Sequence, residues 1–122
     1  MKLSKEEIER YKKLWEKVDF TKIDEEKLEK ESVQVAVILA TLYYHTKGIM
    51  PNEDDVKEKA EEIHMCLVLE KMRREGLIKI NYAEDKKTII GITVTEKGKQ
   101  EALGLLFEKY CQKLLGDVNE DR

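Results

Sequence analysis

The chain of 122 residues has few of the residues that interrupt or cross-link a fold. It contains one Pro, six Gly and two Cys. Cys66 and Cys111 lie far apart, have no CxxC partner and sit in apolar stretches, so we expect reduced thiols in a core or an interface. Because a single Pro leaves most of the chain free to be helical, a mainly α-helical protein is predicted.

Long hydrophobic runs are also lacking. No apolar stretch approaches the roughly 20 residues that span a bilayer, and residues 1–6 carry too much charge for a signal peptide. Hydrophobic residues make up 41% of the chain and charged residues 40%, which excludes a membrane protein and a typical disordered chain. We expect one soluble, cytoplasmic domain. The excess of Lys and Glu over Arg, Asn and Gln is typical of thermophile surfaces.

Signatures of catalysis are missing as well. The sequence has no Gly-rich phosphate loop, no HExxH motif and no recognisable nucleophile arrangement. His64 is two residues from Cys66, and side chains at that spacing on a helix point in different directions. His45 lies near a predicted helix end, where a cationic ring would suit the helix dipole. No enzymatic activity, cofactor or metal site is therefore predicted.

Helix signals dominate the first half of the chain. Ser4 and Glu7 have the spacing of a capping box, and the apolar residues after them predict an amphipathic helix over residues 5–18. Asp24 is expected to cap a second helix that continues through residues 33–44 and ends at Gly48, and Asn52 is expected to cap the helix that follows. Residues 33–44 are apolar nearly all round, which is typical of a central helix covered on most sides.

The second half of the chain reads as helix, hairpin, helix. A helical pattern ends at Gly76, where a C′ residue adopts positive φ. Residues 77–82 alternate as a half-buried strand does, and the β-branched run 88–94 returns after a charged turn. Thr95 can cap a further helix that begins at Glu96.

This order, with LEKMRREGLI at residues 69–78 and VTEKGKQEA at residues 94–102, resembles the winged helix-turn-helix transcriptional regulators. The MarR-like, PadR-like and small archaeal kinds are the most similar, over about residues 32–110. The resemblance implies a mainly α fold with a small β-hairpin wing, flanked by N- and C-terminal helices. It divides a single domain into a helical extension (1–23), a winged-helix core (24–95), a C-terminal helix (96–116) and a mobile tail (117–122).

Residues 53–75 depart from that family pattern. A helix-turn-helix needs a turn, yet residues 61–64 contain no Gly, Pro, Ser or Asn. Met65, Leu69 and Met72 have the core spacing of a recognition helix, whereas Ile63 and Leu67 fall on the opposite side. Either one continuous helix is apolar on two faces, or a tight break lies near residues 61–63. The pattern favours the break.

Charge is unevenly distributed along the chain. The net charge is −3, but residues 71–99 contain eight basic and four acidic residues. Basic residues on a reading helix and a wing are typical of DNA contacts. The candidate DNA-binding residues are His64, Lys71, Arg74, Lys79, Lys86 and Lys87.

The resemblance implies sequence-specific binding of double-stranded DNA by a homodimeric transcriptional regulator, with a repressor as the expected kind. The expected dimer interface comprises Tyr11, Trp15, Leu103, Phe107, Tyr110 and Leu114. For Trp15, packing inside the monomer is an open alternative. A second interpretation is a winged helix that docks a protein partner through Ile63 and Leu67 and binds little or no DNA.

Overall fold

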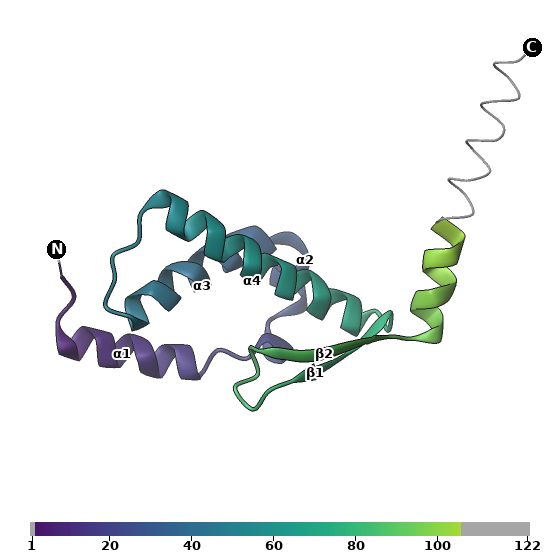
Figure 1. The fold of residues 1–122 in the computed structure, drawn as a ribbon, viewed down its shortest axis with the longest axis horizontal. Helices are drawn as coiled ribbons and strands as arrows, with labels where there is room; N and C mark the ends of the chain where they lie inside the picture. Colours follow the sequence, from purple (N-terminus) through teal and green to yellow (C-terminus); the bar gives the residue numbers. More distant parts are fainter. Residues whose placement is uncertain (1, 106–122) are drawn as a thin grey trace, which may run out of the picture.

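The computed structural model describes residues 2–105, and its fold is mainly helical with one antiparallel hairpin, as expected for a winged helix. Figure 1 shows the helices that precede the hairpin as one compact group, with the hairpin along one side of it and the helix after the hairpin standing apart. The elements are α1 (Lys5–Glu16), η1 (Phe20–Lys22), α2 (Glu25–Lys30), α3 (Ser32–Thr46), α4 (Glu53–Arg74), β1 (Ile78–Tyr82) and β2 (Ile89–Val94). Residues 96–105 are also helical.

The helix boundaries follow local hydrogen-bonding signals. Ser4 and Glu7 form the predicted capping box, and Asn52 forms a second one with Asp55 at the start of α4. Gly48 and Gly76 have φ values of 73° and 80°, the left-handed conformation that ends a helix. These four boundaries confirm the expectations from sequence. They could be predicted because the hydrogen bonds and backbone conformations that set them involve only a few neighbouring residues.

The second predicted helix is in fact two helices. Glu31, at φ −126° and ψ 22°, leaves helical geometry between α2 and α3. This bend turns α2 so that Leu28 becomes buried in the same cluster as Phe20. The expectation of one continuous helix was therefore wrong, because burial of Leu28 stabilises a bend that the local sequence does not signal.

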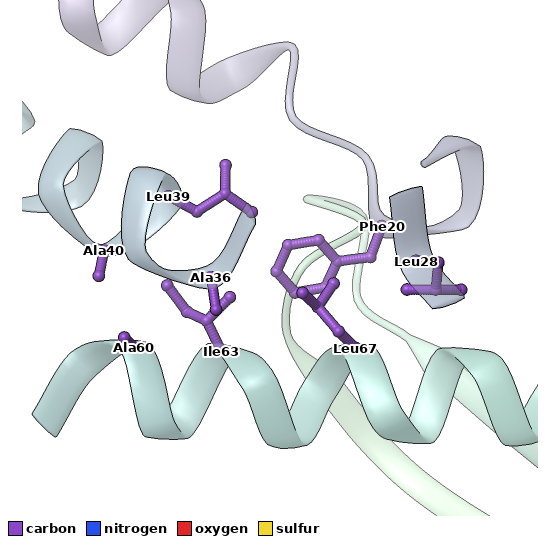
Figure 2. Close-up of a cluster of buried hydrophobic side chains, with 8 residues drawn as sticks. All are labelled: Phe20, Leu28, Ala36, Leu39, Ala40, Ala60, Ile63 and Leu67. Carbon is purple, nitrogen blue, oxygen red and sulfur yellow. The ribbon is translucent and has the colours of Figure 1, made fainter. Parts of the chain in front are cut away.

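The core lies between α3 and α4. Helix α1 packs on the other side of α3, while α2 and η1 close one end of the core. Figure 2 shows the buried cluster: Phe20, Leu28, Ala36, Leu39, Ala40, Ala60, Ile63 and Leu67. The small side chains Ala36, Ala40 and Ala60 let the two long helices approach closely. Contrary to the expectation for a covered central helix, Val33 and Ile38 of α3 remain exposed.

The predicted break near residues 61–63 is absent. α4 runs without interruption for 22 residues, so the two helices of a standard helix-turn-helix are fused into one. Residues 61–64 are all tolerated inside a helix, and no residue there ends one. The expectation of a break rested on the two apolar faces of this segment, and the continuous helix retains both faces.

The fold also reverses the predicted orientation of α4. Ile63 and Leu67 are 5% and 1% exposed and pack in the core, whereas Met65 is 59% exposed. Met65, Leu69 and Met72 thus do not form the core face of this helix. The sequence-based docking site at Ile63 and Leu67 is wrong, because a buried side chain presents no surface to a partner.

The hairpin is in register from Ile78 opposite Val94 to Asn81 opposite Gly91, and an irregularity follows before Tyr82. Beyond it, Thr95 caps the next helix: its hydroxyl accepts a hydrogen bond from Gly98 N–H at 3.0 Å and donates one to the Gly76 carbonyl at 2.6 Å. The Lys97 ammonium bonds the Glu75 carbonyl at 2.8 Å. Helix 96–105 therefore begins at a fixed position beside the last turn of α4.

Candidate nucleic-acid interface

The wing ends in an ordered turn built around Asp85. Its carboxylate accepts hydrogen bonds from the backbone N–H groups of Thr88 (2.8 Å) and Lys87 (2.9 Å) and from the Thr88 hydroxyl (2.7 Å). These bonds lower the pKa of Asp85 to about 2, because all three favour the ionised carboxylate. Lys86, with φ 60°, occupies the left-handed position of this turn. The turn therefore holds two adjacent lysines on a constrained backbone: Lys86 is exposed, whereas Lys87 is half-buried and its ammonium donates to the Asp85 carbonyl at 3.1 Å.

The wing tip is attached to the N-terminal part of the chain. Phe20 N–H donates to the Lys86 carbonyl at 3.3 Å, and the Lys87 ammonium lies 5.6 Å from the centre of the Trp15 ring. The Asp19 carboxylate lies near the charges of Lys22 and Lys86, although the hydrogen bond from the Thr21 hydroxyl is the largest cause of its lowered pKa. Lys22 is exposed and joins the wing lysines at this end of the molecule.

Sequence reasoning missed Lys22. No local pattern identifies it, because its position beside the wing tip depends on how the segment before α2 packs. Lys79 was anticipated: it is exposed and pairs with Thr93, on the hairpin face opposite Ile78 and Ile80. The wing thus carries Lys79 on its outer face and Lys86 and Lys87 at its tip.

The three predicted contacts on α4 have different environments. Lys71 is exposed and forms no ion pair within residues 2–105. Arg74 donates hydrogen bonds to the carbonyls of Phe20 (3.4 Å) and Thr21 (3.2 Å). His64 lies within hydrogen-bond distance of the Ser32 hydroxyl, at 3.2 Å. Arg74 and His64 are therefore engaged inside the subunit, while Lys71 is available at the surface.

A buried carboxylate, Glu70, organises the end of α4. It is fully buried, and its two carboxylate oxygens share the single N–H of Arg73 Nε, at 2.5 and 2.9 Å. The second of these oxygens is also 4.0 Å from Arg74 Nε. The hydrogen bond to Glu70 raises the pKa of Arg73. The sequence analysis gave Glu70 no role, because an acidic residue on a helix rich in charged residues is expected to be exposed to solvent.

The predicted dimer residues divide into three groups. The ring centres of Tyr11 and His45 lie 4.9 Å apart with the rings tilted, and those of Trp15 and Tyr43 lie 5.7 Å apart. Trp15 also packs against the core, so both Tyr11 and Trp15 make contacts within the subunit. Leu103 is 63% exposed. The remaining predicted interface residues, Phe107, Tyr110 and Leu114, lie outside the described residues.

Over residues 2–105, no cluster of three or more His, Cys, Asp or Glu side chains is arranged to hold a metal ion. In the same part of the chain, every helix is too short or too polar to cross a membrane.

Comparison with known proteins supports the resemblance to helix-turn-helix regulators. The chain is 26% identical over 106 residues to the HTH-type transcriptional regulator BilQ of Clostridium symbiosum (strain WAL-14163). The matched region covers 84% of this chain and 74% of that regulator. No family model matches the chain, and no solved structure matches it. The similarity extends to regulators of the helix-turn-helix class and does not distinguish MarR-like from PadR-like members.

Proposed function

We propose that the protein is a homodimeric transcriptional regulator that binds double-stranded DNA, with its wing contacting the phosphate backbone. The observation that carries this proposal is the wing tip, where a hydrogen-bonded turn holds the exposed Lys86 and the half-buried Lys87 close to Lys22, in a chain of net charge −3. Lysines on a constrained turn release counterions from phosphates without first ordering the loop. The name of the similar regulator from Clostridium symbiosum supports the same function.

In this proposal α4 contributes fewer DNA contacts than the sequence predicted. Lys71 is a candidate contact, whereas Arg74 and His64 act first as structural residues. Base reading by the outward surface of α4 is not favoured, since Met65 and Val68 on that surface offer no hydrogen-bond donors or acceptors to base edges. We propose that a two-fold homodimer engages two half-sites about one DNA turn apart and represses by occupying its operator.

A charge-reversal experiment tests the DNA proposal. The double variant Lys86→Glu with Lys87→Glu should bind genomic duplex fragments at least about tenfold more weakly than the wild type, because each change replaces a phosphate-binding charge with a repelling one. Fluorescence anisotropy over a series of salt concentrations measures both the affinity and its salt slope. The slope should fall by about two in the variant.

The matched control is Lys2→Glu with Lys5→Glu, which makes the same charge change at the start of α1, far from the wing (Figure 1). This control should keep its affinity within about twofold. Equal losses in both variants would show that only net charge matters, and undetectable binding by the wild type at low salt would refute the DNA proposal.

A further inference from the structure

One side of α1 carries exposed basic side chains at helical spacing. Arg10, Lys13 and Lys17 follow one another at i, i+3 and i+7, and Lys17, which caps α1, keeps helical φ and ψ. The side of α1 that packs on α3 is a different one and carries Tyr11 and Trp15. The three basic side chains therefore form an outward surface, called here the basic face of α1.

Neighbouring acids do not neutralise the basic face. Within residues 2–105 none of its three side chains forms an ion pair, whereas Lys12, on another side of α1, pairs with Glu9 at 3.6 Å. From residue 10 to residue 22, five exposed side chains are basic and one, Glu16, is acidic. The end of α1 and the segment after it are thus positively charged in a chain whose net charge is −3.

The end of α1 is attached to the wing tip, and Figure 1 shows α1 ending next to the hairpin loop. The Lys87 ammonium lies 5.6 Å from the centre of the Trp15 ring, in the last turn of α1. Beyond the helix, the Phe20 N–H donates to the Lys86 carbonyl at 3.3 Å. Because these two contacts flank Lys17 in the sequence, they hold one end of the basic face beside the wing.

We propose that the basic face of α1 binds phosphates of the same DNA duplex that the wing contacts. The inference rests on the DNA binding of the proposed function and adds a second contacting element to it. Residues 10–17 span about 10 Å along α1, a length over which one DNA strand presents about three phosphates. Contacts of this kind fix the position of a protein on the duplex without reading its bases. The basic face therefore contributes affinity and orientation, whatever the sequence bound.

The structure favours a nucleic acid over a lipid surface as the polyanion. A helix that binds a lipid surface buries a broad apolar face in the membrane. The apolar face of α1 is already packed on α3. The basic face offers charge on a fixed backbone, which is what phosphate contacts on a duplex require.

Charge reversal on α1 tests the contact. In the full chain, Lys13→Glu with Lys17→Glu should bind duplex DNA at least about fivefold more weakly than the wild type and lower the salt slope by about two, because two phosphate contacts are lost. The matched control is Lys5→Glu with Lys12→Glu, which makes the same charge change on another side of the same helix. This control should stay within about twofold of the wild type. Equal losses in both variants would overturn the proposal, since only net charge would then matter.

A DNA-cleaving probe gives a second readout that does not depend on charge reversal. In the full chain with Cys66→Ala and Cys111→Ala, an iron–EDTA reagent is attached at Arg10→Cys or, as the control, at Glu58→Cys. Glu58 is exposed on α4, and α3 lies between α4 and α1. The reagent on α1 should cleave the bound duplex, and the reagent on α4 should leave cleavage at background. Cleavage at background from both positions would contradict the contact.

The outcomes separate this inference from the proposed function. If the variant Lys86→Glu with Lys87→Glu loses affinity while the α1 variant matches its control, the α1 contact is wrong and the wing contact stands. If the wild type binds no duplex at low salt, both fail. Binding of the wild type to anionic phospholipid vesicles, with no binding to duplex, would also overturn both and would identify a lipid surface as the polyanion.

Discussion

The residues with the largest structural effect at the end of α4 are charged, and their contacts join three parts of the fold. Glu70 is buried against Arg73 and Arg74, and Arg74 also bonds the backbone of η1. A buried carboxylate that loses a charged partner is still removed from water, but the interaction that compensated for its desolvation is gone. Substitution in this group should therefore affect stability before it affects any surface contact.

Arg74→Ala should lower the free energy of unfolding by about 2 kcal/mol, because it removes two partly buried hydrogen bonds to backbone carbonyls and one partner of the buried Glu70 carboxylate. Lys71→Ala, on the same helix but exposed, should change it by less than about 0.5 kcal/mol. Urea unfolding followed by circular dichroism measures both. If the two variants were equally stable, the internal role of Arg74 would be wrong.

Tyr82 offers a test of a buried hydroxyl on the wing. Its hydroxyl is buried and has no hydrogen-bond partner within the described residues, and burial raises the pKa of Tyr82 from 10 to about 12. Because the folded pKa is the higher one, the folded state favours the neutral phenol. That contribution is complete below pH 10 and is lost as the pH rises through 12.

Tyr82→Phe should therefore match or exceed the wild type in stability at pH 7, by up to about 1 kcal/mol, since it removes an unsatisfied polar group. Between pH 10 and 12 the wild type should lose stability more steeply than the variant. Unfolding curves collected across this range provide the comparison. A variant that is less stable at pH 7 and parallels the wild type at high pH would contradict the assignment.

At the scale of elements, the sequence predicts boundaries well and helix orientation poorly. Ser4, Asn52, Gly76 and Thr95 mark their boundaries through bonds to nearby backbone, and the structure confirms each of them. The predicted orientation of α4 was wrong, because both faces of this helix carry apolar residues and the sequence does not show which face is buried. Contact with α3 and Phe20 decides which face is buried, and that contact depends on residues distant in sequence.

The continuity of α4 has a measurable consequence at Glu61. Glycine inside an exposed helix costs about 1 kcal/mol relative to alanine, whereas glycine in a turn costs little or is favourable. Glu61→Gly should therefore be about 1 kcal/mol less stable than Glu61→Ala in thermal or urea unfolding. Equal stabilities would indicate the turn that a standard helix-turn-helix places at this point.

At the scale of the whole molecule, the order of elements determined the fold class, but the sequence did not show which charged residues come together. Among the candidate DNA contacts on the wing, the sequence predicted the exposure of Lys79 and Lys86, because charged side chains of a hairpin usually face solvent, but it did not predict that Lys87 is half-buried beside Trp15. The grouping of Lys22 with the wing and the internal bonds of Arg74 both depend on one tertiary contact, in which η1 packs against the hairpin and the end of α4. No local pattern encodes that contact.

That contact changes how the first part of the chain should be regarded. The backbone of residues 20 and 21 connects the hairpin to α4. The N–H of Phe20 donates a hydrogen bond to the hairpin loop, and the carbonyls of both residues accept hydrogen bonds from Arg74 at the end of α4. A protein shortened to begin at Asp24 would retain every residue of the helix, hairpin and helix, but it would lose these hydrogen bonds between the hairpin and α4. The leading segment is thus an integral part of the folded unit, not an appendage to it.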